Sequence, residues 1–279
     1  MSGGGLYLLD VNASFSGTIL QFNNASAGSG GAVFMNAARI GSFIFFKEIY
    51  GLSNYAAGHG GCISLLNTLI HITGLSGASL LAYNRAGGDG GAIYVVNNSL
   101  NIESAVATFG KNVAGGVGGA IALVNSPDSI ARCSIMYNSN EASDGDNVYL
   151  KDSTFNDSTP TFMSKAESHS SIFIGTGSKY SCSMHDNATL GTPNPIVVDS
   201  SGILALSAGS GYCPEVDFSL SQHSDWKPNS QKACSDLKST HSNLRLHSSS
   251  AIDPTTTAIH QNLIMYNGAV AEMSANFSF

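Results

Sequence analysis

The stretch GGAIYVVNN, residues 90–98, places two glycines directly before a short run of β-branched and aromatic residues, and two asparagines close it. Glycine costs conformational entropy inside regular structure, so a pair before a strand indicates a corner where a side chain does not fit. The same pattern begins at Gly3, Gly30, Gly60, Gly90, Gly118 and Gly145. The intervals are 27, 30, 30, 28 and 27 residues, which indicates repeats of one structural unit.

Asparagine and aspartate recur at two places in this repeat. One stands six or seven residues after the first glycine, as Asp10, Asn36, Asn67, Asn97, Asn125 and Asp152. Another stands six residues before it, as Asn24, Asn54, Asn84 and Asn112. Identical amide side chains that stack along an axis can form a hydrogen-bonded ladder. We therefore expect the second set to form a ladder at one corner of a stacked structure.

Short apolar runs fill the rest of each repeat, for example SFIFF at 42–46 and LIHI at 69–72. Such runs with polar breaks are typical of strands, and no long segment keeps a helical stripe. A repeat near 28 residues with about three strands suits one coil of an all-β parallel β-helix, stacked at ~4.8 Å. The corners would be made by pairs that need a positive φ or close backbone approach. These pairs are Gly30 and Gly31, Gly60 and Gly61, Gly90 and Gly91, and Gly118 and Gly119.

The register of the repeat changes along the chain. Regular coils are expected over residues 3–155 and irregular coils over 156–207, which together form one β-helix from residue 1 to 207. Residues 208–279 are rich in polar runs and are predicted to be an irregular, partly disordered tail.

Composition narrows the classes of function. Charged residues make up only 11% of the chain, the net charge is −7, and the Lys and Arg residues are scattered, which argues against nucleic-acid binding. No apolar run is long enough for a transmembrane helix. The start has no signal peptide and lies inside a repeat, so we expect an N-terminally incomplete chain from an extracellular or cell-surface protein.

The five cysteines have no metal-binding or redox spacing. Cys62 and Cys133 lie in apolar runs and are expected to be buried thiols. Cys213 and Cys234 bracket a polar loop and could pair if the protein is exported, and pairing among Cys182, Cys213 and Cys234 stays open.

The candidates for chemistry are sparse. Asp144 and Asp146 flank Gly145 and are weak candidates for a cation site, although a solvated corner explains them better. His59 lies between glycines with no carboxylate beside it in sequence, and Asp89 is expected to form an exposed ion pair with Arg85. His71 alternates with apolar residues and is expected to face outward. We therefore predict no catalytic residue and no cofactor.

The repeat resembles that of a known family. GGAV at 30–33 and GGAI at 90–93 and 118–121 resemble the GGA-[ILV] repeat of polymorphic outer membrane proteins, and FGKN at 109–112 resembles the companion F-x-x-N motif. GGCI at 60–63 and GDNV at 145–148 depart from the pattern, and the resemblance covers roughly residues 3–155. It implies a right-handed parallel β-helix of the pectin-lyase-like fold, displayed at the cell surface and linked to adhesion. Partners would be proteins or glycans of host or neighbouring cells.

Two functions follow as hypotheses. The first is a non-catalytic cell-surface or secreted β-helix, adhesin-like or structural, and a fragment of a longer protein. The alternative is a polysaccharide lyase or glycoside hydrolase on the same fold, which would need several carboxylates and basic side chains on one face. The arginines fall at different distances from the glycine pairs, which favours the first.

Overall fold

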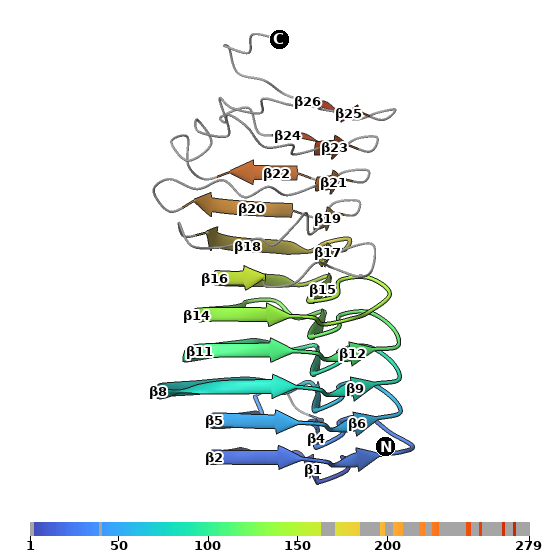
Figure 1. Ribbon diagram of the computed structural model, residues 1–279, viewed down its shortest axis with the longest axis vertical. Helices are drawn as coiled ribbons and strands as arrows, with labels where there is room; N and C mark the ends of the chain where they lie inside the picture. Colours follow the sequence, from blue (N-terminus) through green and yellow to red (C-terminus); the bar gives the residue numbers. More distant parts are fainter. Residues whose placement is uncertain are drawn as a thin grey trace.

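The chain is described by a computed structural model in which residues 3–38, 41–162 and 171–184 are placed, together with short strands between residues 196 and 271. The described residues form strands and turns and no helix, and their strands pair in parallel between successive coils. Figure 1 shows the coils stacked along one axis. The predicted all-β parallel β-helix is therefore confirmed.

Three sheets run along the stack. Sheet A holds, in order, β1 (Leu6–Leu9), β4 (Val33–Asn36), β7 (Ile63–Leu66), β10 (Ile93–Val96), β13 (Ile121–Val124), β15 (Val148–Lys151), β17 (Ile172–Ile174), β19 (Ile196–Val198), β21 (Phe218–Leu220), β23 (Leu244–Leu246) and β25 (Ile264–Met265). Sheet B holds the longer strands β2 (Ala13–Gln21), β5 (Phe43–Leu52), β8 (Leu69–Ala82), β11 (Leu100–Gly110), β14 (Ser129–Asn138), β16 (Thr154–Phe162), β18 (Lys179–Met184), β20 (Ile203–Ala208), β22 (Asp225–Pro228), β24 (Ala251–Ile252) and β26 (Val270–Ala271). Sheet C holds β3 (Asn24–Ala25), β6 (Tyr55–Ala56), β9 (Arg85–Ala86) and β12 (Val113–Ala114).

Alternate residues of each strand point into the stack and form its core. In sheet A the inward column is Val33, Ile63, Ile93, Ile121 and Val148, all fully buried. Sheet C instead lines the interior with alanines: Ala25, Ala56, Ala86 and Ala114. Because equivalent residues lie above one another, each coil buries its apolar side chains against those of the neighbouring coils in one continuous core.

Both glycines of each pair are required at the corner, for different reasons. The first has a positive φ, between 65° and 70° at Gly30, Gly60, Gly90 and Gly118. The second has no room for a side chain, since a Cβ on Gly91 would lie 2.1 Å from the carbonyl oxygen of Gly119. The predicted role of the glycine pair is confirmed.

The other two corners of the coil also use the left-handed region. At one corner the residue seven positions after the first glycine has a positive φ: Asp10, Asn67, Asn97, Asn125 and Asp152. Asn36 lies six positions after Gly30 and ends β4, so it is outside this column. At the remaining corner the left-handed residue directly precedes the ladder asparagine: Phe22, Ser53, Tyr83, Lys111 and Ser139.

The asparagine ladder exists, with one correction to its register. Asn54 donates from Nδ2 to Oδ1 of Asn84 at 2.9 Å, Asn84 donates likewise to Asn112, and Asn112 to Asn140. The first member is Asn23, which donates to Asn54, whereas Asn24 is exposed and pairs with Tyr55 in sheet C. The prediction of Asn24 was wrong because the turn before Gly30 holds one more residue than the turns before Gly60 and Gly90.

Fewer predictions from the sequence can be compared with the structure in the later part of the chain. Strands β19 to β26 continue the parallel pairing of sheets A and B through residue 271. The segments between them, including Cys213 and Cys234, lie outside the described residues, so the irregular tail and the disulfide stay predictions. Cys62 and Cys133 are buried and form no disulfide, and their burial was expected. Burial raises the pKa of Cys62 to about 12, although a hydrogen bond from Asn54 opposes the shift.

Candidate functional site

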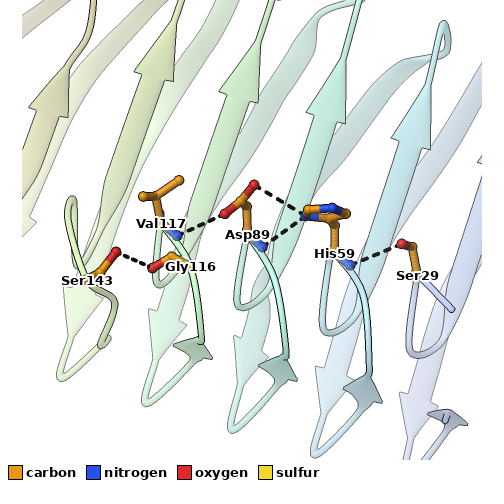
Figure 2. Close-up of polar contacts among 6 residues, drawn as sticks. All are labelled: Ser29, His59, Asp89, Gly116, Val117 and Ser143. Carbon is orange, nitrogen blue, oxygen red and sulfur yellow. Dashed lines mark hydrogen bonds and ion pairs between the residues drawn. The ribbon is translucent and has the colours of Figure 1, made fainter. Parts of the chain in front are cut away.

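The residue types associated with catalysis meet in the turn that leads from sheet C to sheet A. Ser29, His59, Asp89 and Val117 each directly precede a glycine pair, so they lie one coil apart in a single column (Figure 2). The backbone N–H of His59 donates to Ser29 Oγ at 3.0 Å, and the backbone N–H of Asp89 donates to His59 Nδ1 at 3.0 Å. The backbone N–H of Val117 donates to Asp89 Oδ1 at 3.0 Å. We call this set the turn column.

The turn column contains serine, histidine and aspartate but is not arranged as a catalytic triad. In a triad a ring nitrogen of the histidine takes the proton of the serine hydroxyl. Here Ser29 Oγ accepts from the backbone of His59, and the imidazole faces Asp89 instead. Each side chain therefore binds the backbone of the next coil, which is a structural use of its polar atoms.

His59 and Asp89 interact closely. Nδ1 of His59 lies 3.3 Å from Asp89 Oδ2 and also accepts the backbone hydrogen bond of Asp89. One ring nitrogen cannot accept and donate a proton at the same time, so the contact with Asp89 Oδ2 requires a proton on Nδ1, whereas the backbone hydrogen bond from Asp89 requires an unprotonated Nδ1. The hydrogen bond with His59 lowers the pKa of Asp89, although partial burial opposes the shift. The ion pair expected between Asp89 and Arg85 is wrong, because among the described residues Asp89 pairs with His59.

Aromatic packing is a second structural role of the His59 side chain. The imidazole stacks on the ring of Tyr94 at 4.5 Å. It belongs to the same coil as Ser64, which faces outward from sheet A yet is only 1% exposed. Within a coil, a bulky turn residue thus accompanies a small outward-facing residue of sheet A, and a small turn residue accompanies a bulky outward-facing one. The pairs, turn residue first, are Ser29 with Phe34, His59 with Ser64, Asp89 with Tyr94, Val117 with Ala122, and Asp144 with Tyr149.

A separate charged cluster lies on the outer face of sheet B. Arg132 of β14 donates to Glu103 Oε1 of β11 at 3.0 Å, and His71 Nε2 of β8 lies 3.4 Å from Glu103 Oε2 without hydrogen-bond geometry. The imidazole of His71 also meets Phe45 edge-on, with ring centroids 5.3 Å apart. We call His71, Glu103 and Arg132 the sheet B cluster. His71 faces outward, as predicted, but its partners one and two coils away were not foreseen.

The outer face of sheet C carries a hollow of about 470 Å³. Its lining residues are Tyr55, Arg85, Ala86, Gly87, Val113 and Gly115. Tyr55, Arg85 and Val113 are the outward residues of β6, β9 and β12, one from each successive coil. Tyr83 and Lys111 lie two residues before Arg85 and Val113 in the chain, and the Lys111 ammonium lies 5.3 Å from the ring centroid of Tyr83. We call this the sheet C hollow.

The acidic corner has a structural explanation. Asp146 is 1% exposed, and its Oδ1 accepts the backbone N–H of Ala142 at 2.9 Å. The backbone carbonyl of Asp144 accepts from Gly118. Among the placed parts of the chain, no group of three His, Cys, Asp or Glu side chains is arranged to hold a metal ion.

One carboxyl group lies inside the stack. Asp157 of β16 is fully buried in register with Ala131, and its Oδ2 accepts hydrogen bonds from the hydroxyls of Tyr137 and Tyr180 at 3.0 and 3.1 Å. Its Oδ1 has no hydrogen-bond partner among the described residues. Burial raises the pKa of Asp157 to about 7, against the two tyrosine hydrogen bonds, which lower it.

Comparisons of the chain with protein-family models, with curated proteins and with solved structures found no match. Across the described residues there is no helix with the length and apolar character needed to cross a membrane. The site residues must therefore be interpreted from their own geometry.

Proposed function

We propose that this chain is a non-catalytic, cell-surface or secreted β-helix that serves as an adhesin-like or structural interaction module. The observation that carries the proposal is the turn column, where the polar atoms of Ser29, His59 and Asp89 bind the neighbouring coil. A catalytic site needs such groups aimed at one substrate atom. Side chains that bind successive coils instead stabilise a long, regular surface for recognition.

Two further observations support this role. The GGA-[ILV] repeat resembles that of polymorphic outer membrane proteins, whose β-helices are displayed at the cell surface. Large apolar side chains are exposed at the corner that precedes the ladder asparagines, including Phe22 at 78% and Tyr83 at 57%. Exposed aromatic side chains are typical of binding surfaces. Partners are then proteins or glycans of host or neighbouring cells.

Protease treatment of intact source cells tests the location. We expect the natural protein to be cleaved by an added protease before the cells are lysed, or to be recovered from the medium. A cytoplasmic protein of the same cells serves as the control for lysis. Complete protection until lysis would contradict display or secretion.

A carbohydrate-active enzyme is the second candidate, and the sheet B cluster favours it. Glu103 can act as a base, and Arg132 can neutralise a substrate carboxylate, as a lyase reaction requires. However, Arg132 already binds Glu103 at 3.0 Å, so each of these groups is occupied by the other. The two functions differ in outcome with an acidic polysaccharide, which is retained intact by a binding module and cleaved by an enzyme.

A further inference from the structure

We propose that the sheet C hollow binds a carboxylate-bearing saccharide, with Arg85 holding the carboxylate and Tyr55 contacting the sugar ring. The inference rests on the proposed interaction role and names a ligand class for it. Arg85 is exposed at the hollow, and the described residues include no carboxylate that forms an ion pair with it. A planar guanidinium with free donors matches a carboxylate in bidentate geometry.

Neighbouring residues complete the site. Tyr55 lies in register with Arg85, one coil earlier, and is 39% exposed, so an edge or face of its ring is open to a ligand. Lys111, two residues before Val113 of the lining, lies over the ring of Tyr83 in the preceding coil, and this cation–π contact restrains its ammonium. Two cations and two tyrosines thus lie on three successive coils, which are spaced about 4.8 Å apart along the axis.

The backbone favours a saccharide over a peptide. A peptide that adds to a sheet needs unpaired N–H and C=O groups. Around the hollow these groups are bonded between coils, since Arg85 N–H donates to Asn54 and Gly87 N–H to Ala56. Recognition must therefore use side chains, and an arginine beside exposed aromatic rings suits a sugar that carries one carboxylate. The net charge of −7 also disfavours unspecific binding of polyanions elsewhere.

Calorimetric titration with two probes tests this assignment. The first is an oligosaccharide of alternating uronic acid and neutral sugar, and the second is the same oligosaccharide with its carboxyl groups reduced to alcohols. We expect the wild-type chain to bind only the first, and more weakly as salt rises. Arg85→Gln should weaken binding at least ~10-fold. The affinity of Arg85→Lys should lie between those of wild type and Arg85→Gln, because lysine keeps the positive charge but lacks the bidentate geometry of the guanidinium group.

Lys151→Gln is the control, because it removes an exposed positive charge from sheet A, away from the hollow, and should leave binding unchanged. Equal thermal unfolding of all variants shows that they are folded. The assignment is overturned if wild type does not bind the acidic probe, if the reduced probe binds equally, or if Arg85→Gln has no effect. Equal binding of poly-glutamate would assign the hollow to acidic peptides instead. Each of these results is compatible with the proposed non-catalytic role, whereas cleavage of the probe would contradict it.

Discussion

At the scale of single residues, the two glycines of a pair meet different constraints. Gly90 has a φ of 69°, a backbone conformation that is energetically unfavourable for any residue with a side chain. Gly91 has an ordinary φ but faces backbone atoms of the next coil. A Cβ on Gly91 would lie 2.1 Å from the carbonyl oxygen of Gly119. That oxygen belongs to the backbone of the next coil, so it cannot move away unless the whole coil moves.

Gly91→Ala should therefore destabilise the fold strongly, by more than about 3 kcal/mol in the free energy of unfolding, at the severe end of single substitutions. Gly110→Ala is the control, because it is also buried in the stack but a Cβ there meets its nearest atom at 3.8 Å. Urea unfolding of both variants measures the difference. Equal stability of the two would contradict the steric explanation of the glycine pair.

Asp157 gives the residue-scale prediction for pH. Its pKa is about 7 in the folded chain, against an ordinary value of 3.8 that applies when unfolded. Between these values the unfolded chain loses the proton while the folded chain keeps it. The contribution of Asp157 to stability is therefore greatest below pH 4 and is lost as the pH rises to about 7, by up to ~4 kcal/mol.

Asp157→Asn keeps the shape and the acceptor for Tyr137 and Tyr180 but does not titrate. Urea unfolding between pH 4 and pH 8 should show wild type losing stability relative to Asp157→Asn as the pH rises. Parallel pH profiles for the two proteins would contradict a protonated carboxyl group inside the stack.

At the scale of elements, the asparagine ladder joins the coils at one corner. Asn84 uses all its polar atoms: Oδ1 accepts from the backbone and side chain of Asn54, and Nδ2 donates to Asn112 and to the carbonyl of Gly51. Buried groups of this kind are stabilising only when every partner is present.

Asn84→Asp removes both donors and places a carboxylate against two oxygens in the interior. We expect a loss of at least about 3 kcal/mol, as for other uncompensated buried charges. Asn24→Asp is the control, since Asn24 is exposed and lies one residue outside the ladder. Thermal unfolding compares the two, and a larger effect at Asn24 would restore the register first predicted from the sequence.

The same elements explain how far the sequence predicts the molecule. The glycine pair and the apolar run after it recur in nearly every coil, so the stacked fold could be predicted from Gly30, Gly60, Gly90 and Gly118 alone. Side-chain contacts between coils depend on the length of each turn. His59 and Asp89 both directly precede a glycine pair, so aligning the repeats on these pairs would have predicted that the two side chains lie next to each other in successive coils.

The sheet B cluster was harder to predict. His71, Glu103 and Arg132 lie 11, 13 and 14 residues after their glycines, so no fixed position in the repeat relates them. The pairing of β8, β11 and β14 shifts register within the strands, and only the structure shows how these side chains converge.

At the scale of the whole molecule, the polar side chains divide into two groups. The turn column and the ladder bind coil to coil, whereas the sheet B cluster and the sheet C hollow face solvent. The first group makes the stack regular, and the second offers surfaces to a partner. A non-catalytic role requires that such a surface bind a ligand without changing it.

The most direct measurement is therefore the fate of an acidic polysaccharide after long incubation with the purified chain, with and without calcium. Ultraviolet absorbance detects unsaturated lyase products, and new reducing ends detect hydrolysis. We predict an unchanged chain length and no new absorbance or reducing ends. Cleavage that is lost in Glu103→Gln but retained in Asp146→Asn would contradict the non-catalytic role and identify the sheet B cluster as an active site.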